Sequence, residues 1–252
     1  MIETTERFSG RVESYRQFRP RYPDAIVDLL QSACGLTVNS FIADVAAGTG
    51  LLAEIFLARG YTVTAIEPND GMRAACSALT EQFPKLKCVS GTAEATGLPA
   101  HSVNLITVGQ AMHWFDLKRT RSEFDRVLRP QGRCAVVYNH RRTGVDAFHE
   151  GYEQLLREFG TDYETVQSKH LSPEKIKDFF APSVMKEAVF ANAQPLTLEG
   201  LEGRILSSSY MPSEGHPHYA AMRSAIAELF IRHERDGCVR LEYECVVCYG
   251  RL

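Results

Sequence analysis

A glycine-rich turn and a glutamate downstream of it are the two features of the sequence that could hold a nucleoside. Asp44, Gly48 and Gly50 lie between an apolar strand pattern and a helical pattern, which predicts a turn at a helix N-terminus. Such a turn lets a ligand approach backbone amides closely. Glu67 ends the next strand pattern seventeen residues after Gly50, where a carboxylate can accept both hydroxyl groups of a ribose. Together the two features predict a nucleoside ligand.

Asp44 separates two cofactor classes that share these features. The pattern Gly48-x-Gly50-x-x-Ala53 also satisfies a relaxed dinucleotide fingerprint, which would make the protein an NAD(P)-linked oxidoreductase. A carboxylate directly before the glycines would repel a pyrophosphate, but it would suit the ammonium group of a methionine moiety. No second half-site for a nicotinamide nucleotide is found in the sequence. A helix-capping or loop-bracing role for Asp44 is the alternative.

Polar and aromatic side chains follow the fourth strand pattern, at 103–109. Gln110, His113 and Trp114 lie within five residues of its end. Open parallel sheets bind ligands outside the carboxyl ends of their strands, so these residues are expected to border a reaction pocket. Trp114 could instead be a packing anchor, and His113 could cap a loop rather than transfer a proton.

A basic segment that ends with Arg141 and Arg142 follows the fifth strand pattern and is expected at the same edge of the sheet. Either arginine could bind an anionic substrate through paired hydrogen bonds. A solvated basic loop is the alternative for each of them. If the reaction needs a general base, the candidates are His113, His140 and Tyr210.

The apolar patterns predict an α/β fold. Seven strand patterns occur, at 41–47, 62–66, 86–90, 103–109, 133–139, 184–193 and 239–249. Helical patterns separate most of them, at 50–59, 70–82, 117–128, 145–159, from Ser172, 198–208 and 217–234. This alternation predicts right-handed crossovers and a doubly wound, mostly parallel seven-stranded sheet that is covered on both faces. The last two strands are expected to pair antiparallel, which gives an antiparallel edge strand. Residues 91–102 are expected to contain a short helix or none.

We expect a single domain over residues 1–252, because no repeat or linker divides the chain. Two helical patterns, around Phe8–Tyr15 and from Pro23, precede the first strand. The three parts of the domain are expected to be an N-terminal helical lid, a cofactor-binding core and a helical insertion, over 1–40, 41–139 and 197–236. The lid offers three side chains that could contact a substrate or simply pack between helices: Tyr15, Arg19 and Tyr22.

The run from Asp44 to Gly50 resembles motif I of class I S-adenosylmethionine-dependent methyltransferases, and Glu67 resembles their ribose-binding acidic residue. Residues 91–99 are similar to the adenine-binding segment of that family. Two further runs, Phe8–Pro23 and Gln110–Asp116, resemble the type 11 branch, which includes trans-aconitate methyltransferase-like proteins. The resemblance implies a Rossmann-like methyltransferase fold, S-adenosyl-L-methionine as cofactor, and methyl transfer to a small-molecule acceptor, with organic acids among the candidates.

Two positions depart from the family pattern. Ala46 stands where motif I usually has its first glycine, and Thr92 stands where the adenine-binding aspartate is usual. Glu94 could take over the contact with the adenine amino group. A protein that binds the cofactor without catalysis is a further alternative, although the histidine and aromatic residues after the fourth strand favour a reaction.

The resemblance and the residue types together define a candidate site. The cofactor-binding residues are expected to be Asp44, Ala46, Gly48, Thr49, Gly50, Glu67, Met72, Thr92, Ala93, Glu94, Gln110 and Trp114. The substrate-binding residues are expected to be Tyr15, Arg19, Tyr22, Arg141 and Arg142. A carboxylate acceptor would need no general base, whereas a phenol, amine or carbon acid would need one.

Composition disfavours several other classes of protein. The chain has 28 Lys and Arg against 31 Asp and Glu, so no overall positive field would attract nucleic acid. No apolar run reaches membrane-spanning length, and residues 1–23 lack the apolar region of a signal peptide. Seven scattered cysteines fit the reduced thiols of a cytoplasmic protein. Cys245 and Cys248 are three residues apart in a strand pattern and point to opposite faces, so no metal site is expected. The oligomeric state is left open.

Overall fold

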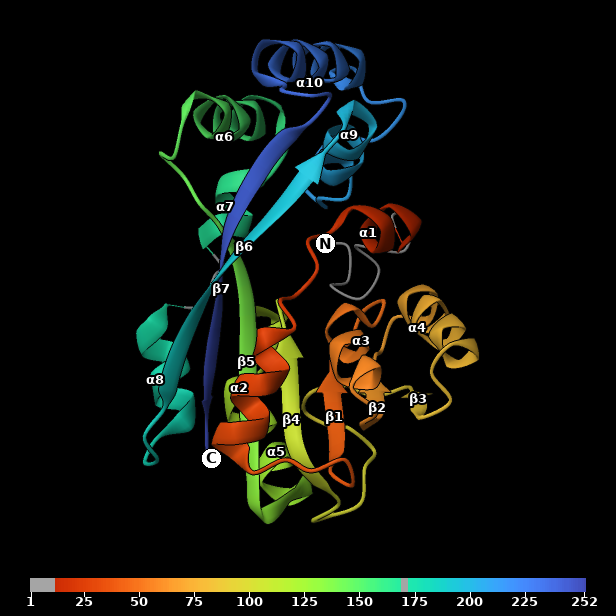
Figure 1. Cartoon of the computed structure of the whole chain (residues 1–252), viewed down its shortest axis with the longest axis vertical. Helices are drawn as coiled ribbons and strands as arrows, with labels where there is room; N and C mark the ends of the chain where they lie inside the picture. Colours follow the sequence, from red (N-terminus) through yellow and green to blue (C-terminus); the bar gives the residue numbers. More distant parts are fainter. Residues whose placement is uncertain (1–11, 169–171) are drawn as a thin grey trace.

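The computed structural model describes residues 12–168 and 172–252, which form a seven-stranded sheet with helices on both faces (Figure 1). The strands are β1 (Phe41–Val45), β2 (Thr62–Ile66), β3 (Leu86–Val89), β4 (Val103–Gly109), β5 (Leu128–Arg141), β6 (Lys186–Leu196) and β7 (Val239–Gly250). The α-helices are α1 (Val12–Phe18), α2 (Ala25–Cys34), α3 (Leu51–Ala58), α4 (Asp70–Ser77), α5 (Leu117–Val127), α6 (Ala147–Phe159), α7 (Tyr163–Ser168), α8 (Pro173–Phe180), α9 (Leu198–Leu206) and α10 (Tyr219–His233).

The sheet has the strand order β3-β2-β1-β4-β5-β7-β6. The first five strands along the chain pair in parallel, whereas β7 runs antiparallel to both of its neighbours, β5 and β6. The predicted doubly wound, mostly parallel sheet is therefore confirmed. The last two strands pair antiparallel at one edge, as expected, with β7 placed between β5 and the outermost strand β6.

Apolar side chains cover both faces of the sheet. Helices α2, α3 and α4 pack on one face, and helices α5 and α8 pack on the other. Cys245 is buried on the first face and Cys248 on the second, as the period of two residues in a strand predicts. Among the described residues, no helix combines the length and apolar character needed to cross a bilayer.

Strand β5 is longer than the predicted 133–139, because it starts at Leu128 and ends at Arg141. Its first residue pairs with β4, and its last residue pairs with Tyr243 of β7. Neighbouring strands supply these hydrogen bonds, so a polar sequence can be a strand without showing an apolar pattern of its own. Two smaller expectations can also be compared with the structure. Residues 91–102 contain no helix. The first helical pattern corresponds to α1, and Phe8, with which that pattern begins, lies outside the described residues.

Strands β6 and β7 extend beyond the rest of the sheet and carry a group of helices (Figure 1). We call α6, α7, α9 and α10 the cap. A third apolar cluster joins Tyr152 of α6, Leu201 of α9 and Ile226 of α10 to Tyr243 of β7. The cap thus comes from two segments of the chain, and the expected insertion over 197–236 covers only the second of them.

Candidate cofactor and acceptor cavities

The carboxyl ends of the parallel strands bring most of the predicted site residues to one edge of the sheet. Strands β1, β2 and β4 end directly before the glycine-rich turn, before Glu67 and before Gln110. Two adjoining cavities lie there. We call the one lined by Gly48 and Glu67, of about 230 Å³, the turn cavity. The other, of about 460 Å³, is lined by four arginines, and we call it the arginine cavity.

The glycine-rich turn requires backbone conformations that favour glycine. Gly50 has φ of 86°, and a Cβ atom placed on it would lie 2.9 Å from the Cys76 Sγ atom, so no larger residue fits. Ala46 also lies in the left-handed region, with φ of 54°. This conformation favours glycine over an L-residue such as alanine.

Asp44 lies behind the turn and is 1% exposed. Its Oδ1 atom accepts a hydrogen bond from Thr107 Oγ1 at 2.7 Å, and its Oδ2 atom makes no hydrogen bond with the described residues. Burial raises the pKa of the Asp44 carboxyl to about 7. The Asp44 Oδ2 atom is therefore a buried acceptor that could receive a hydrogen bond from a cationic group at the turn.

Glu67 connects the end of β2 to the turn. Its Oε2 atom accepts a hydrogen bond from the Gly48 amide, and its Oε1 atom accepts one from the Asn69 amide, both at 2.9 Å. These two bonds fix the carboxylate at the wall of the turn cavity. Each carboxylate oxygen has a second lone pair, so Glu67 can still accept ribose hydroxyl groups. Burial raises the pKa of Glu67.

Nine of the twelve predicted cofactor-binding residues line the turn cavity: Ala46, Gly48, Glu67, Met72, Thr92, Ala93, Glu94, Gln110 and Trp114. The other three, Asp44, Thr49 and Gly50, are buried behind its wall. Glu94 uses its Oε1 atom to accept a hydrogen bond from the Asp116 amide at 2.9 Å, at the start of α5. Glu94 therefore braces that helix, and only its other oxygen could also serve a base.

The residues around the turn cavity fit S-adenosylmethionine. The unused Asp44 oxygen suits the ammonium group, the fixed Glu67 carboxylate suits the ribose, and the side chain of Met72 with the backbone of Ala93 suits an adenine ring. A pyrophosphate at the turn would instead meet the buried carboxylate of Asp44, which would repel it when ionised.

The two cavities meet at Tyr15, Gln110 and Trp114, which line both of them. Gln110 has φ of 58°, and its Nε2 atom donates a hydrogen bond to the Asn139 carbonyl at 3.2 Å. This bond holds the Gln110 side chain across the boundary between the cavities. A group transferred from one cavity to the other would pass these three side chains.

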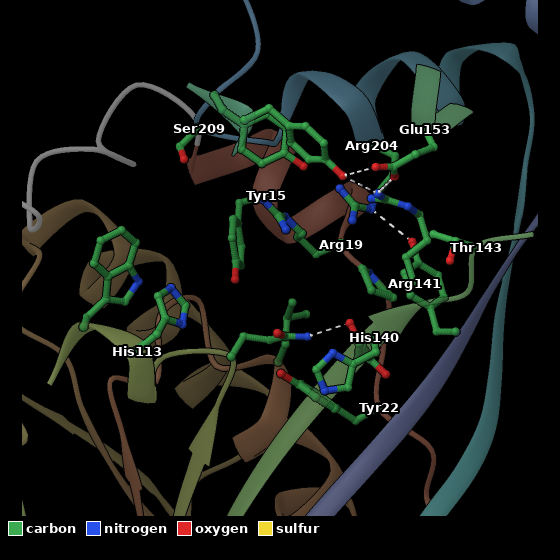
Figure 2. A pocket seen from close by; sticks show the side chains of 18 of the residues that line it. Tyr15, Arg19, Tyr22, His113, His140, Arg141, Thr143, Glu153, Arg204 and Ser209 are labelled. Carbon is green, nitrogen blue, oxygen red and sulfur yellow. Dashed lines mark hydrogen bonds and ion pairs between the residues drawn. The ribbon is translucent and has the colours of Figure 1, made fainter. Parts of the chain in front are cut away.

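Two of the guanidinium groups in the arginine cavity lie close together without a carboxylate partner (Figure 2). Arg19 lies over the Tyr15 ring and donates to the Ser207 carbonyl at 2.9 Å. Arg204 is 5% exposed and donates to Tyr243 and to the Ser208 hydroxyl. Neither arginine forms an ion pair with any carboxylate of the described residues. Burial and the neighbouring Arg204 both lower the pKa of Arg19.

The third guanidinium group is already paired. Arg141 donates to Glu153 and to the Tyr163 hydroxyl, and it lies 5.0 Å above the Tyr152 ring. Glu153 also forms an ion pair with Arg157 at 3.2 Å. Among the described residues of the cavity, Arg141 and Arg157 are both paired with glutamates, whereas Arg19 and Arg204 have no carboxylate partner.

The arginine cavity also contains the predicted candidates for proton transfer, His113, His140 and Tyr210, together with Tyr22. Desolvation lowers the pKa of His140, which favours the neutral imidazole at pH 7. The Tyr163 and Tyr210 rings lie 5.0 Å apart and form part of the wall on the cap side.

Arg142 does not line either cavity. Its side chain is exposed and donates to Glu242 of β7 at 2.8 Å. Consecutive residues at a strand end project in opposite directions, so Arg141 and Arg142 cannot both face the cavity.

Sequence reasoning missed the contribution of the cap. The cavity residues it did not identify include Glu153, Arg157, Tyr163, Arg204 and Tyr243. One signal was present: Arg204 follows the apolar residue Leu201 by three positions, the spacing of residues on one helix face. A charged residue is rarely buried on an apolar helix face unless its side chain is paired with other polar groups.

Comparisons with known proteins agree with this geometry. A family model described as a methyltransferase domain matches residues 43–136. An uncharacterised methyltransferase of Mycobacterium tuberculosis is 34% identical over 66% of this chain, and the match spans 64% of that protein. An uncharacterised methyltransferase-like protein of Schizosaccharomyces pombe is 31% identical, over 94% of this chain and 92% of its own length. The solved structure of a candidate type II methyltransferase from Anaeromyxobacter dehalogenans has a TM-score of 0.67 at 23% identity, covering 93% of this chain and 98% of that one.

Proposed function

The chain belongs to the methyltransferase family, and we propose that it transfers a methyl group from S-adenosylmethionine to a small anionic acceptor, most simply a carboxylate. One observation carries the choice of acceptor. Arg19 and Arg204 are two adjacent guanidinium groups in a cavity beside the cofactor site, and neither has a carboxylate partner among the described residues.

Electrostatics supports an anionic ligand in this cavity. Removing a charge from water is expensive unless the charge is paired, and two like charges side by side increase the penalty. An acceptor with an oxyanion would offset that penalty by accepting paired hydrogen bonds from the two guanidinium groups. A neutral acceptor would leave both charges uncompensated.

The position of the cavity supports a small acceptor. Its wall combines Tyr15 and Arg19 near α1 with Glu153, Tyr163 and Arg204 of the cap, so elements from both ends of the chain surround it. A volume of about 460 Å³ lies in the ordinary range for metabolite pockets. Such an enclosure would admit a metabolite and exclude a nucleic acid duplex, and it would keep water away from the reaction.

The residues of the chain would promote methyl transfer mainly by positioning the acceptor and the cofactor. When bound, S-adenosylmethionine supplies a methyl group on a positively charged sulfonium. Arg19 and Arg204 would orient the acceptor, while Tyr15, Gln110 and Trp114 would surround the path of the methyl group between the cavities.

The proposed acceptor also determines whether a proton must move. A carboxylate is already a nucleophile, so it needs no general base. His113, His140 or Tyr210 would be needed only for an acceptor that starts protonated. The neutral form of His140, favoured by its lowered pKa, could take that proton at pH 7.

Labelled-methyl assays can test this proposal. A panel of carboxylic acids, phenols, amines and tRNA would be incubated with the protein and S-adenosylmethionine carrying a labelled methyl group. We expect transfer to carboxylic acids, and we expect Arg204→Ala and Arg19→Ala to lower kcat/KM by about 10- to 100-fold, the loss of a hydrogen bond between charged groups. Arg142→Ala is the matched control, because its exposed ion pair should contribute little.

Two results would contradict the proposal. Transfer to neutral acceptors that is indifferent to Arg19 and Arg204 would reject the anionic acceptor. Transfer to tRNA alone would reject the enclosed pocket. Because Arg204→Ala could disturb the packing of α9, Arg204→Lys should be measured too, and it should keep part of the activity, since lysine retains the charge but not the paired donors.

A further inference from the structure

Cys76 and Cys88 lie side by side at the rear of the turn cavity. Cys76 is in the last turn of α4, Cys88 is in β3, and their Sγ atoms are 3.4 Å apart. Cys76 is buried, whereas Cys88 is half-buried. The exposed part of Cys88 gives the pair a route to small solutes.

The pair contacts the glycine-rich turn directly. A Cβ atom on Gly50 would lie 2.9 Å from the Cys76 Sγ atom, so the sulfur fills the space that the glycine leaves. Cys76 is also one helical turn after Met72, which lines the turn cavity. A movement of the Cys76 sulfur would therefore reach both the turn and the helix that border the cofactor.

The environment gives the two thiols different acidities. The contact between the two sulfurs lowers the pKa of Cys88, with further help from Ser77 and from the charge of Arg73. The same contact raises the pKa of Cys76. Cys88 is therefore the more acidic thiol of the pair, and Cys76 is the less acidic one. Cys34 is also half-buried, but desolvation raises its pKa to about 11, so it is a poor nucleophile.

We propose that Cys76 and Cys88 are a modification site, a thiol pair that a hydroperoxide converts to a disulfide, and that this disulfide weakens cofactor binding. In the first step the Cys88 thiolate attacks hydrogen peroxide, the O–O bond breaks, and a sulfenic acid forms as hydroxide leaves. In the second step the Cys76 sulfur attacks the Cys88 sulfur, the S–S bond forms, and the Cys76 proton and the sulfenic hydroxyl group leave as water. The two sulfurs lose two electrons in total, and one peroxide becomes one water and one hydroxide ion, which takes a proton from solvent to form a second water.

The disulfide would change the turn cavity because of its short bond. A disulfide joins sulfurs at about 2.05 Å, well below the present 3.4 Å, so the two sulfurs must move toward each other, by rotation of the side chains, by approach of α4 and β3, or by both. A displaced Cys76 sulfur would change its contact with Gly50, and any movement of α4 would shift Met72 as well. Binding equilibria are reciprocal, so bound cofactor should in turn oppose disulfide formation. The effect on the cofactor rests on the proposed function, whereas formation of the disulfide does not.

Mass spectrometry tests the modification itself. The reduced full chain would be treated with stoichiometric hydrogen peroxide, alkylated, and digested with trypsin without reduction. We expect a linked pair of peptides, 74–85 and 88–118, two hydrogen atoms lighter than their sum and separated by dithiothreitol. The link should be absent from Cys88→Ser and unchanged in Cys34→Ser, the matched control. Full alkylation of Cys76 and Cys88 after treatment, or linkage of either to another cysteine, would overturn the proposal.

Calorimetry with S-adenosylhomocysteine tests the consequence. We expect oxidation to weaken its binding by about tenfold, within the usual range of coupling between sites, and we expect dithiothreitol to restore it. Oxidised Cys88→Ser should bind like the reduced protein. A disulfide that leaves the affinity unchanged would overturn the proposed coupling. A reduced protein that does not bind S-adenosylhomocysteine at all would contradict the proposed function instead, and the peptide measurement would still decide whether the thiol pair is oxidised.

Discussion

The ionised Asp44 side chain is expected to lower the stability of the ligand-free protein and to strengthen cofactor binding. Its carboxyl is buried with one oxygen unused, and its pKa is raised to about 7 by burial. Between about pH 4 and pH 7 the folded protein holds a proton that the unfolded chain has released. The free energy of unfolding therefore falls as the pH rises through this window, and the loss is complete above it. A cofactor ammonium group would compensate the ionised form.

Asp44→Asn should separate these two effects. Asparagine keeps the acceptor for Thr107 but cannot ionise. We expect the ligand-free variant to be more stable than the parent at pH 8 by about 1–3 kcal/mol, and the difference to shrink toward pH 5. Its affinity for S-adenosylhomocysteine should be lost. Urea unfolding at several pH values and calorimetry provide the two measurements. A stability difference that does not depend on pH would show that Asp44 does not titrate in this window.

At the scale of elements, the turn from β1 to α3 contains backbone strain at Ala46, which a glycine at the same position would not have. Ala46 has φ of 54°, a region that costs an L-residue roughly 1–2 kcal/mol. Glycine would remove this strain, but it would also increase the entropy of the unfolded chain, at roughly 0.4–1 kcal/mol. The two effects nearly cancel, so alanine is tolerated at this position.

Ala46→Gly is therefore expected to leave the free energy of unfolding unchanged or to raise it by up to about 1 kcal/mol. Ala47→Gly is the matched control from the same turn, because Ala47 is not in the left-handed region. The control should lose about 0.4–1 kcal/mol. Denaturant unfolding of both variants is the measurement, and equal destabilisation of the two would argue against strain at Ala46.

At the scale of the whole molecule, the cofactor should bind only to the folded chain, since its site combines residues that follow four separate strands. A ligand of this kind stabilises the protein by mass action, by about 2.7 kcal/mol at a hundred times its Kd. For a chain of this size we expect S-adenosylhomocysteine to raise Tm by roughly 5–10 °C.

The same thermal measurement distinguishes the two cofactor classes that the glycine pattern allows. NAD and NADP at equal concentration should leave Tm unchanged, because Asp44 is poorly suited to a pyrophosphate. A rise with NAD alone would reverse this assignment.

Local sequence determines much of the fold and of the turn cavity. The strands, the glycine-rich turn and the position of Glu67 depend on periodicity and backbone preference within short segments, which sequence carries directly. Parallel strands then place the residues after them at one edge, so the sequence by itself predicts that Gln110 and Trp114 lie beside Gly48.

The arginine cavity and the thiol pair depend instead on how distant elements pack. Arg204 is 185 residues from Arg19 in sequence, and their proximity arises only because α9 packs on α1. Cys76 and Cys88 meet because α4 packs beside β3. Arg142 points away because pairing with β7 extends β5 to Arg141. Local patterns specify which residues form an element, but the face that each side chain presents to a distant partner is set by long-range packing and strand pairing.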